Sequence, residues 1–234
     1  MHIPDGLVDG RTCAIAGLIA LGALTLAVRW VTATIDERQV PMMGLASAFV
    51  FAVQMLNFPV ASGTSGHLLG GVLAAVLVGP MAGALCVSVV LVVQSLLFAD
   101  GGVSALGLNV INMSLVGAFG GYVIFAALRA VLPRTRSALV VAAGVAAFLA
   151  PVMASIAFTV EYAVGGHGVA SVRTIAVAMI GVHVLIGIGE GALTAMTVAA
   201  VLASRPDLVH GLRGAVPARS GTRVRGPGAT PVQA

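Results

Sequence analysis

The first two residues of the chain and one distant histidine could bind a transition metal together. The free α-amine of Met1, the main-chain nitrogen of His2 and the His2 imidazole can close two fused chelate rings on one ion. His67 could supply a fourth nitrogen. Four nitrogens in a plane favour Ni(II) or Cu(II), whereas hard oxygen ligands suit magnesium and calcium. Judged by spacing alone, an ordinary surface histidine is the commoner explanation of His2.

The residues just before His67 could orient its ring. Positions 63–66 combine two glycines with two hydroxyl side chains, one of them Ser65. Hydrogen-bonding groups of this kind orient the histidines that bind metals. A histidine that begins a helix at the membrane interface is an equally good explanation.

Polar side chains also interrupt the apolar runs of the sequence. His183 and Glu190 are two helical turns apart and would share one face of a helix. An ionisable residue inside a membrane span is a functional candidate, and His183 is the nearest partner for Glu190. Hydrogen bonding between helices is the alternative role. The other interruptions are amides: Gln54, Asn57, Gln94, Asn109 and Asn112.

The composition predicts that these residues belong to a membrane protein. Hydrophobic residues make up 59% of the 234 positions and charged residues only 9%. Soluble domains carry about 25% charged residues, so this chain has too few to cover a water-facing surface. Lipid demands apolar side chains and internally satisfied main-chain groups, which helices provide. We therefore predict an all-α integral membrane protein.

Seven apolar runs predict a bundle of about seven transmembrane helices. The third run is too short to cross a hydrocarbon core of about 30 Å alone. Short, interrupted segments of this kind mark binding sites in membrane proteins. We expect one membrane-embedded domain, residues 1–204, followed by a disordered basic cytoplasmic tail, residues 205–234. The runs cover about residues 12–35, 41–58, 68–78, 81–98, 103–128, 138–164 and 171–203.

The distribution of arginine predicts the orientation of the bundle. Most arginines fall on the side of the tail, and that side should be cytoplasmic. The N-terminus then lies outside, together with Asp5, His67 and Asp100. Residues 1–10 contain no basic residue, so they do not resemble a signal peptide and Met1 should keep its amine. We expect a multi-pass protein of the plasma (inner) membrane, in contact with lipid.

Three kinds of function lack their signatures. The chain has no G-x-x-x-x-G-K-[ST] motif, so nucleotide hydrolysis by a P-loop is not expected. It has no H-E-x-x-H motif, which argues against a zincin-like protease. The basic tail has no aromatic residue to stack on bases, so nucleic acid is not an expected partner. The chain itself is predicted not to be an enzyme.

Four motifs follow one another along the chain: Met1-His2-Ile3-Pro4-Asp5-Gly6, residues 57–60 with 63–71, residues 94–102 with 106–109 and 112–113, and residues 186–190. Together they resemble the CbiM/NikM family, the substrate-binding (S) components of energy-coupling factor transporters for cobalt and nickel. The resemblance runs from residue 1 to about residue 200. It departs from the family pattern at Ala61-Ser62, where Pro-Gly is common, and this could loosen the loop that carries His67.

The resemblance implies a particular ligand set. An N-terminal segment would enter the bundle from outside and bind the metal through the Met1 amine, the His2 amide and imidazole, and His67. Co2+ or Ni2+ would be the transported substrate, and no resident cofactor is expected. The residues that we expect to line or support this site are Asp5, Asn57, Ser65, Gln94, Asp100 and Asn109.

The resemblance also implies partners. They are a transmembrane coupling protein, cytoplasmic ATPase subunits and a small accessory membrane subunit. No apolar span follows Ala203, so no accessory domain is expected in this chain. This free-standing form favours cobalt, whereas the four-nitrogen ligand set favours nickel. We give cobalt a slight preference.

Two other functions remain open from the sequence. One is a membrane metalloenzyme that uses His67, His183 and Glu190. The other is an ion-coupled secondary carrier in which Glu190 is a proton or cation site. Both would tolerate replacement of His2, whereas a metal-capture component would not.

Overall fold

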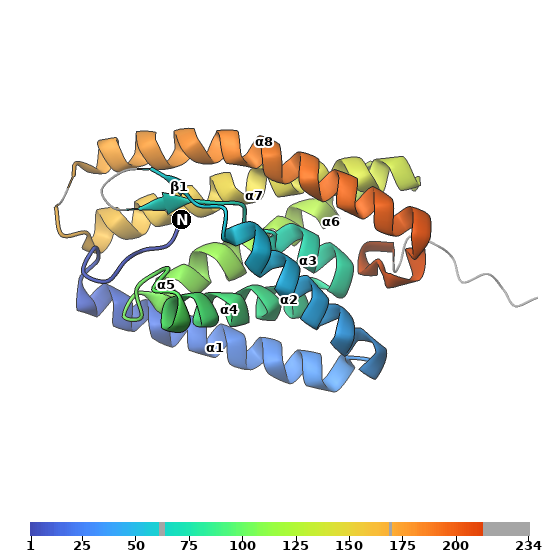
Figure 1. Cartoon of the computed structure of the whole chain (residues 1–234), viewed down its shortest axis with the longest axis horizontal. Helices are drawn as coiled ribbons and strands as arrows, with labels where there is room; N and C mark the ends of the chain where they lie inside the picture. Colours follow the sequence, from blue (N-terminus) through green and yellow to red (C-terminus); the bar gives the residue numbers. More distant parts are fainter. Residues whose placement is uncertain (61–63, 169, 213–234) are drawn as a thin grey trace, which may run out of the picture.

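The computed structural model describes residues 1–60, 64–168 and 170–212, which form a helical bundle (Figure 1). The predicted helical class is confirmed, with one small hairpin added, whose strands are β1 (Phe58–Pro59) and β2 (Ser65–Gly66). The helices are α1 (Gly10–Thr34), α2 (Val40–Gln54), α3 (Gly71–Val78), α4 (Pro80–Leu97), α5 (Leu106–Asn109), α6 (Gly121–Val131), α7 (Arg136–Gly165) and α8 (Val172–Ser204).

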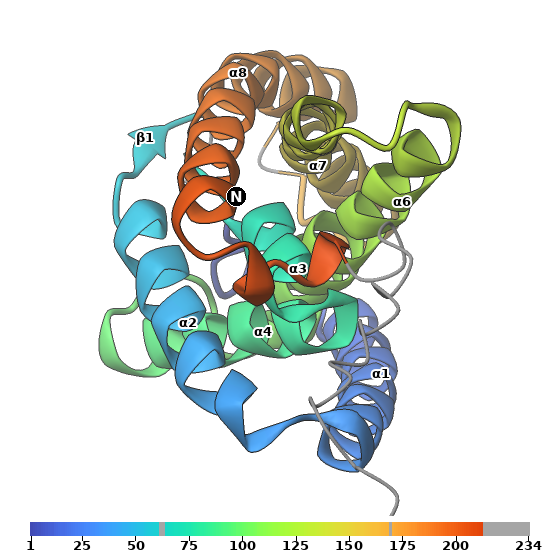
Figure 2. The ribbon, with the colours of Figure 1, turned by 90° about the vertical axis from the view of Figure 1, so that its right-hand side faces the viewer.

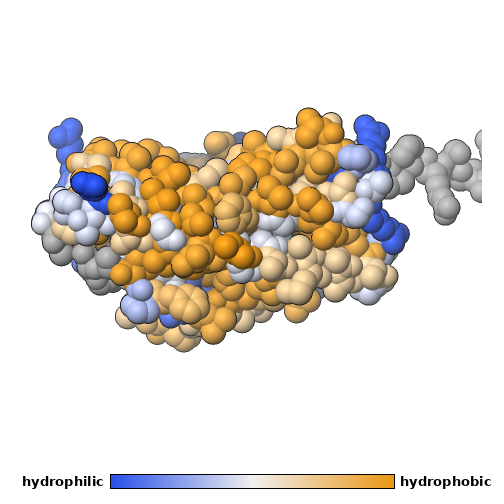
Figure 3. Space-filling model, turned by 90° about the horizontal axis from the view of Figure 1, so that it is seen from above, coloured by the Kyte–Doolittle hydropathy of each residue, from blue (hydrophilic) through white to orange (hydrophobic). Residues whose placement is uncertain are grey.

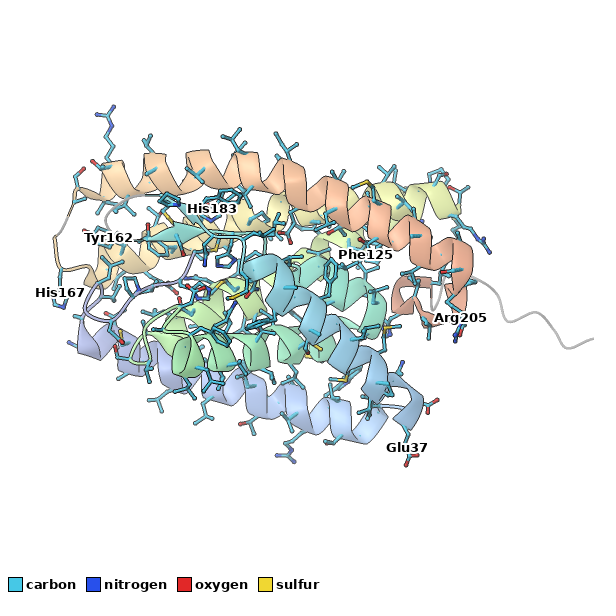
Figure 4. The ribbon with its side chains drawn as sticks, in the orientation of Figure 1. Glu37, Phe125, Tyr162, His167, His183 and Arg205 are labelled. Carbon is cyan, nitrogen blue, oxygen red and sulfur yellow. The ribbon has the colours of Figure 1, made fainter. Side chains whose placement is uncertain are left out.

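Five helical segments are long and apolar enough to cross a membrane. They are α1, α4, α7, α8 and the continuous segment Leu106–Val131, which includes α5 and α6. Hydrophobic side chains cover the middle of the face seen in Figure 3, and hydrophilic ones gather at its two ends. His167 lies at one end of the bundle, and Glu37 and Arg205 lie at the other (Figure 4). This arrangement is that of a multi-pass helical membrane protein.

Two shorter helices, α2 and α3, complete the bundle. Helix α2 has 15 residues and α3 has eight, so α3 reaches only about 12 Å. All eight α3 residues are buried, and α3 lies in the middle of the bundle when it is viewed end-on (Figure 2). Gly70 and Gly79 flank α3 with positive φ angles of 67° and 101°, which favour glycine. The chain thus enters and leaves α3 through sharp turns.

Local sequence explains where the long helices begin. The Asp9 carboxylate caps α1 by accepting hydrogen bonds from the main-chain nitrogens of Arg11 and Thr12, at 2.9 and 3.0 Å. Pro80 occupies the first turn of α4, where its missing N–H costs nothing. Helix α7 begins after Thr135 and α8 after Ser171, and each side chain caps its own helix.

The segment Val110–Gly120, labelled η2, is a π-helix between α5 and α6. The sequence predicts only an ordinary helical run there. π-Helical turns are rare and occur often at functional sites. The wider turn carries Asn112 and Ser114, both fully buried. Ser114 donates a hydrogen bond to the main-chain oxygen of Ala84 at 2.7 Å, which joins η2 to α4.

The chain after α8 folds back onto the bundle for several residues. We expected a disordered tail from residue 205, whereas Pro206–Leu208 and His210–Leu212 form two 3-10 turns. Val209 is buried, with 1% of its side chain exposed. The remainder of the predicted tail, residues 213–234, lies outside the described residues.

Candidate metal site

The N-terminal strap, residues 1–9, enters the bundle instead of lying on its surface (Figure 1). Met1 is fully buried and His2 is 4% exposed. The other end of the strap joins the loop between α7 and α8. The nitrogen of Asp9 donates to the Gly165 oxygen at 2.7 Å, and the nitrogen of His167 donates to the Leu7 oxygen at 3.0 Å.

Asn109 holds the strap just after its first two residues. Its side-chain oxygen accepts from the Ile3 nitrogen at 2.7 Å, and its side-chain nitrogen donates to the Ile3 oxygen at 3.2 Å. The Ile3 oxygen also accepts from the Gly102 nitrogen at 2.8 Å. The amide side chain thus pairs with the strap as a neighbouring β-strand would, and Met1 and His2 are directed inward.

The hairpin segment, residues 58–60 and 64–70, carries His67 from the other side. Gly66 pairs with Phe58 across the hairpin. After His67, the Glu190 carboxylate of α8 accepts from the nitrogens of Leu69 and Gly70, at 2.5 and 2.7 Å. The Gln54 side chain of α2 donates to the Leu69 oxygen at 2.8 Å. Buried side chains from two helices therefore fix the position of His67.

The strap and the hairpin segment meet at the first two residues. The Met1 amine donates a hydrogen bond to the main-chain oxygen of Ser65. The His2 and His67 rings lie with their centroids 4.7 Å apart and their planes tilted by 31°. Sequence positions 2 and 67 are thus brought together, with the amine beside them.

The hydrogen bonds of His67 determine which ring nitrogen is free. Its Nδ1 lies 2.8 Å from the Leu68 oxygen, which can only accept, so we place the proton of the neutral ring on Nδ1. Nε2 then carries a lone pair. It is buried and makes no hydrogen bond within the described residues. A buried acceptor of this kind is available to a metal.

His2 is oriented so that its Nδ1, and not its Nε2, could bind a metal. Its Nε2 lies 3.6 Å from the Asp100 carboxylate, which is too far for a hydrogen bond, but the negative charge of Asp100 favours the neutral ring with its proton on Nε2. The lone pair is then on Nδ1, the atom that a chelate ring with the His2 amide requires. A Cβ atom on Gly101 would come within 2.8 Å of this Nδ1. Gly101 therefore leaves the space that a ligand on Nδ1 would need.

Burial keeps these nitrogens neutral. It lowers the pKa of the Met1 amine to about 4, although the Asp100 charge opposes this shift. Burial, assisted by the nearby N-terminal amine, lowers the pKa of His2 to about 3. Burial also holds the pKa of His67 well below its usual value of 6.5. At neutral pH all three groups are deprotonated bases with lone pairs that can bind a metal.

The other predicted site residues take different positions. Gln94 is fully buried, and neither polar atom of its side chain makes a hydrogen bond within the described residues. Asn57 is exposed and donates to Asp100 at 3.0 Å. Asp5 is also exposed and accepts from the nitrogen of Ser104 at 2.8 Å. Ser65 meets the Met1 amine through its main-chain oxygen, not through the hydroxyl that the sequence suggested.

The expected pairing of His183 with Glu190 is wrong. Both side chains are buried on α8, but Glu190 accepts from the nitrogens of Leu69 and Gly70. His183 Nδ1 instead lies 2.6 Å from the Met179 oxygen of its own helix. The shared helical face was predicted correctly, but the backbone of the hairpin segment provides better partners for the carboxylate.

One half-buried carboxylate, that of Glu161, was missed by the sequence reasoning. Glu161 of α7 accepts a hydrogen bond from the side chain of Asn112 at 2.6 Å. It lies in the apolar run 138–164, where a lone ionisable residue is the available signal. The bond joins α7 to the π-helix η2.

Side chains alone do not assemble a metal site here. Within residues 1–60, 64–168 and 170–212, no three His, Cys, Asp or Glu side chains form a group that could hold a metal. A site at His2 and His67 therefore needs nitrogens of the main chain. The Met1 amine and the His2 amide are two such nitrogens, next to the His2 ring in the chain.

The fold and the buried nitrogens define a class: a multi-pass membrane protein with buried nitrogen atoms inside its bundle that could bind a transition metal. Residues 2–208 match the family described as "Cobalt uptake substrate-specific transmembrane region", CbiM. The chain belongs to this family, and it is a membrane component of metal uptake.

Named relatives and a solved structure agree with this assignment. The chain is 39% identical to "Putative fused nickel transport protein NikMN" of Archaeoglobus fulgidus over 90% of this chain and 68% of the relative. It is 33% identical to "Cobalt transport protein CbiM" of Sorangium cellulosum over 91% of this chain and 96% of the relative. A crystal structure of a truncated transition metal transporter superposes with a TM-score of 0.80 at 30% identity, over 87% of this chain and 99% of that one.

Proposed function

We propose that this protein captures Co2+ or Ni2+ on the outer face of the plasma membrane and delivers it to an ATP-driven importer of the energy-coupling factor type. The observation that carries the proposal is the meeting of the Met1 amine, His2 and His67 in a buried position. The relatives named for nickel and cobalt transport support the choice of metal.

The proposed ligands are four nitrogens from the strap and the hairpin segment. The Met1 amine, the His2 main-chain nitrogen and His2 Nδ1 would form the two fused rings, and His67 Nε2 would close the set. Only the His2 amide must lose a proton, because burial keeps the other three nitrogens neutral. Asp100 beside the His2 ring would offset part of the charge of the cation.

The proposed orientation has the N-terminus outside and the C-terminus in the cytoplasm after seven crossings. Five helical segments would cross alone. The other two crossings would each combine a short helix with the hairpin: α2 with the hairpin in one direction, and the hairpin with α3 in the other. Arg205 lies at the end opposite His167 (Figure 4), the connection between α6 and α7 carries Arg134, and α7 begins at Arg136. The positive-inside rule then makes the Arg205 end cytoplasmic.

The proposed partners supply the energy. A transmembrane coupling protein, cytoplasmic ATPase subunits and a small accessory membrane subunit would complete the transporter, because this chain carries no P-loop motif. Cobalt is the first substrate to test, since the family is described for cobalt uptake. Nickel is the second, since four planar nitrogens suit Ni(II).

The position of Glu190 weighs against the two other functions. A metalloenzyme with His67, His183 and Glu190, or a carrier coupled through Glu190, would need a carboxylate that is free to bind. Both of its oxygens instead accept hydrogen bonds from the hairpin segment. Relatives named as transport proteins speak against an enzyme as well.

Calorimetric titration of the purified protein with Co2+ and Ni2+ tests the proposal. His67→Ala removes a proposed ligand and is expected to weaken binding by at least a hundredfold. His167→Ala is the matched control, because the His167 side chain is exposed at the same end (Figure 4) and its hydrogen bond to the strap comes from its main-chain nitrogen. Equal affinities for the two variants would overturn the proposal.

A further inference from the structure

His183 is a third buried imidazole near the proposed site, and the proposed function leaves it without a role. Its side chain is fully buried in α8. Nδ1 lies 2.6 Å from the Met179 oxygen, which can only accept, so the proton of the neutral ring is on Nδ1. Nε2 carries the lone pair and makes no hydrogen bond within the described residues. Native proteins leave few buried polar atoms in this condition without a reason.

His183 lies close to the hairpin segment just before His67. A Cβ atom on Gly66 would stand 3.4 Å from Cε1 of His183 and 2.8 Å from Cδ1 of Ile186. Glycine at this position therefore lets the hairpin segment approach α8 closely at His183. The imidazoles of His67 and His183 are near enough to interact electrostatically. The two free Nε2 atoms thus belong to neighbouring segments.

His183 also lies deeper in the bundle than the entry to α8. It follows the first residue of α8, Val172, by eleven positions, which is about 16 Å along the helix axis. Figure 4 places it inside the bundle, away from His167 at the end. His2, His67 and His183 do not form one metal group in the part of the chain that the structure describes. His183 is therefore beside the proposed capture ligands and not among them.

We propose that His183 is a transit ligand, which binds the metal together with His67 after the metal has dissociated from the strap ligands of Met1 and His2. This inference rests on the proposed function. The two imidazoles would give the ion two nitrogen ligands after the strap has withdrawn. Imidazole nitrogen suits cobalt and nickel, and each of these two rings already has its lone pair on Nε2.

The exchange of ligands balances without a redox step. The bonds from the metal to the Met1 amine, the His2 amide and His2 Nδ1 break, and the amide nitrogen regains one proton from water. The bond from the metal to His183 Nε2 forms without loss of a proton. The proton of the ring stays on Nδ1, which donates it in a hydrogen bond to the main-chain oxygen of Met179. The metal remains divalent and stays bound to His67 throughout.

Disabling the strap isolates the proposed transit pair. In a His2→Ala background, titration of the full-length protein with Co2+, followed by visible absorption, should reveal weak residual binding. Adding His183→Asn should weaken this residual binding at least tenfold, because asparagine can keep the bond to Met179 but lacks the Nε2 ligand. His2→Ala with His167→Ala is the matched control and should bind as His2→Ala alone. Equal residual affinity with and without His183, or no residual binding in His2→Ala, would overturn the inference.

The single variant separates this inference from the proposed function. His183→Asn alone should bind Co2+ within about threefold of the unmodified protein. A loss as large as that of His67→Ala would make His183 a capture ligand and overturn the transit role. If the unmodified protein binds neither metal, the proposed function fails and the inference fails with it. If the unmodified protein binds metal through His2 but the residual binding of the His2→Ala protein does not depend on His183, only the inference fails.

Discussion

The strap and the hairpin segment carry the proposed ligands into the bundle, but they are held in different ways. The strap is held by main-chain bonds to loops at the His167 end and by Asn109. The hairpin segment is held by Glu190 and Gln54, both buried in the bundle. The strap thus ends in a buried chain terminus, whereas His67 lies in mid-chain beside residues that are bonded to buried side chains of two helices.

This difference indicates how capture and release can be combined. A ligand arm that is fixed by the core, His67, keeps its position whether or not a metal is bound. A ligand arm that reaches the site from a chain end, Met1 and His2, can leave without disturbing the helices. The predictions below alter one arm at a time.

The largest expected effect comes from the anchor of the hairpin segment. Glu190→Ala leaves two buried main-chain N–H groups without partners, at about 1–3 kcal/mol each. Thermal unfolding in detergent should show a clear loss of stability, together with a loss of metal affinity. Glu37→Ala, at an exposed glutamate of the other end (Figure 4), is the control and should change neither. A Glu190→Ala protein as stable as the control would show that Glu190 does not hold the hairpin segment in place.

The anchor of the strap should affect binding more than folding. Asn109→Ala removes both hydrogen bonds to Ile3, so Met1 and His2 lose their alignment. Metal affinity is expected to fall about 10- to 100-fold, as for other groups that orient metal ligands. Calorimetry gives the affinity, and the unfolding temperature should drop less than in Glu190→Ala. A larger loss of stability than of affinity would show that Asn109 serves the fold.

The pH dependence of the metal affinity should show that one proton is released when the metal binds. The pKa is about 4 for the Met1 amine and about 3 for His2, and that of His67 is lowered well below 6.5. Above roughly pH 5 these three groups are already deprotonated, so only the His2 amide loses a proton when the metal binds. Affinity should therefore rise about tenfold per pH unit between roughly pH 5 and 8. Competition titrations over this range measure the slope. A pH-independent affinity would exclude the amide ligand, and a slope of two or more would mean that the bases are protonated before binding.

The smallest effect is expected at the exposed part of the strap. Asp5→Ala removes hydrogen bonds to Ser104 in an exposed setting, so the loss is about 0.5–1.5 kcal/mol or less. Metal should dissociate up to about tenfold faster in stopped-flow exchange with a chelator. Asp207→Ala, an exposed aspartate of the Arg205 end, is the control and should leave the rate unchanged. A hundredfold effect of Asp5→Ala would place Asp5 within the site.

The sequence predicted the helices and the meeting of His2 with His67 better than it predicted their supports. Apolar runs mark helices because lipid and core both demand apolar side chains, so the long helices lie near their predicted ranges. The partner of Glu190 was mispredicted, because main-chain amides of a loop leave no residue-specific mark in the sequence. The π-helix η2 and Glu161 were missed for a similar reason: their meaning depends on which helices become neighbours.

The most direct test of the proposed site is to move the chain terminus. Addition of one glycine before Met1 replaces the amine with a peptide nitrogen while all side chains stay in place. Mass spectrometry confirms the terminus of each form, and calorimetry with Co2+ and Ni2+ compares the extended protein with one that begins at Met1. We expect the extended protein to unfold at nearly the same temperature and to lose tight metal binding. Tight binding of metal by the extended protein would contradict the proposed site.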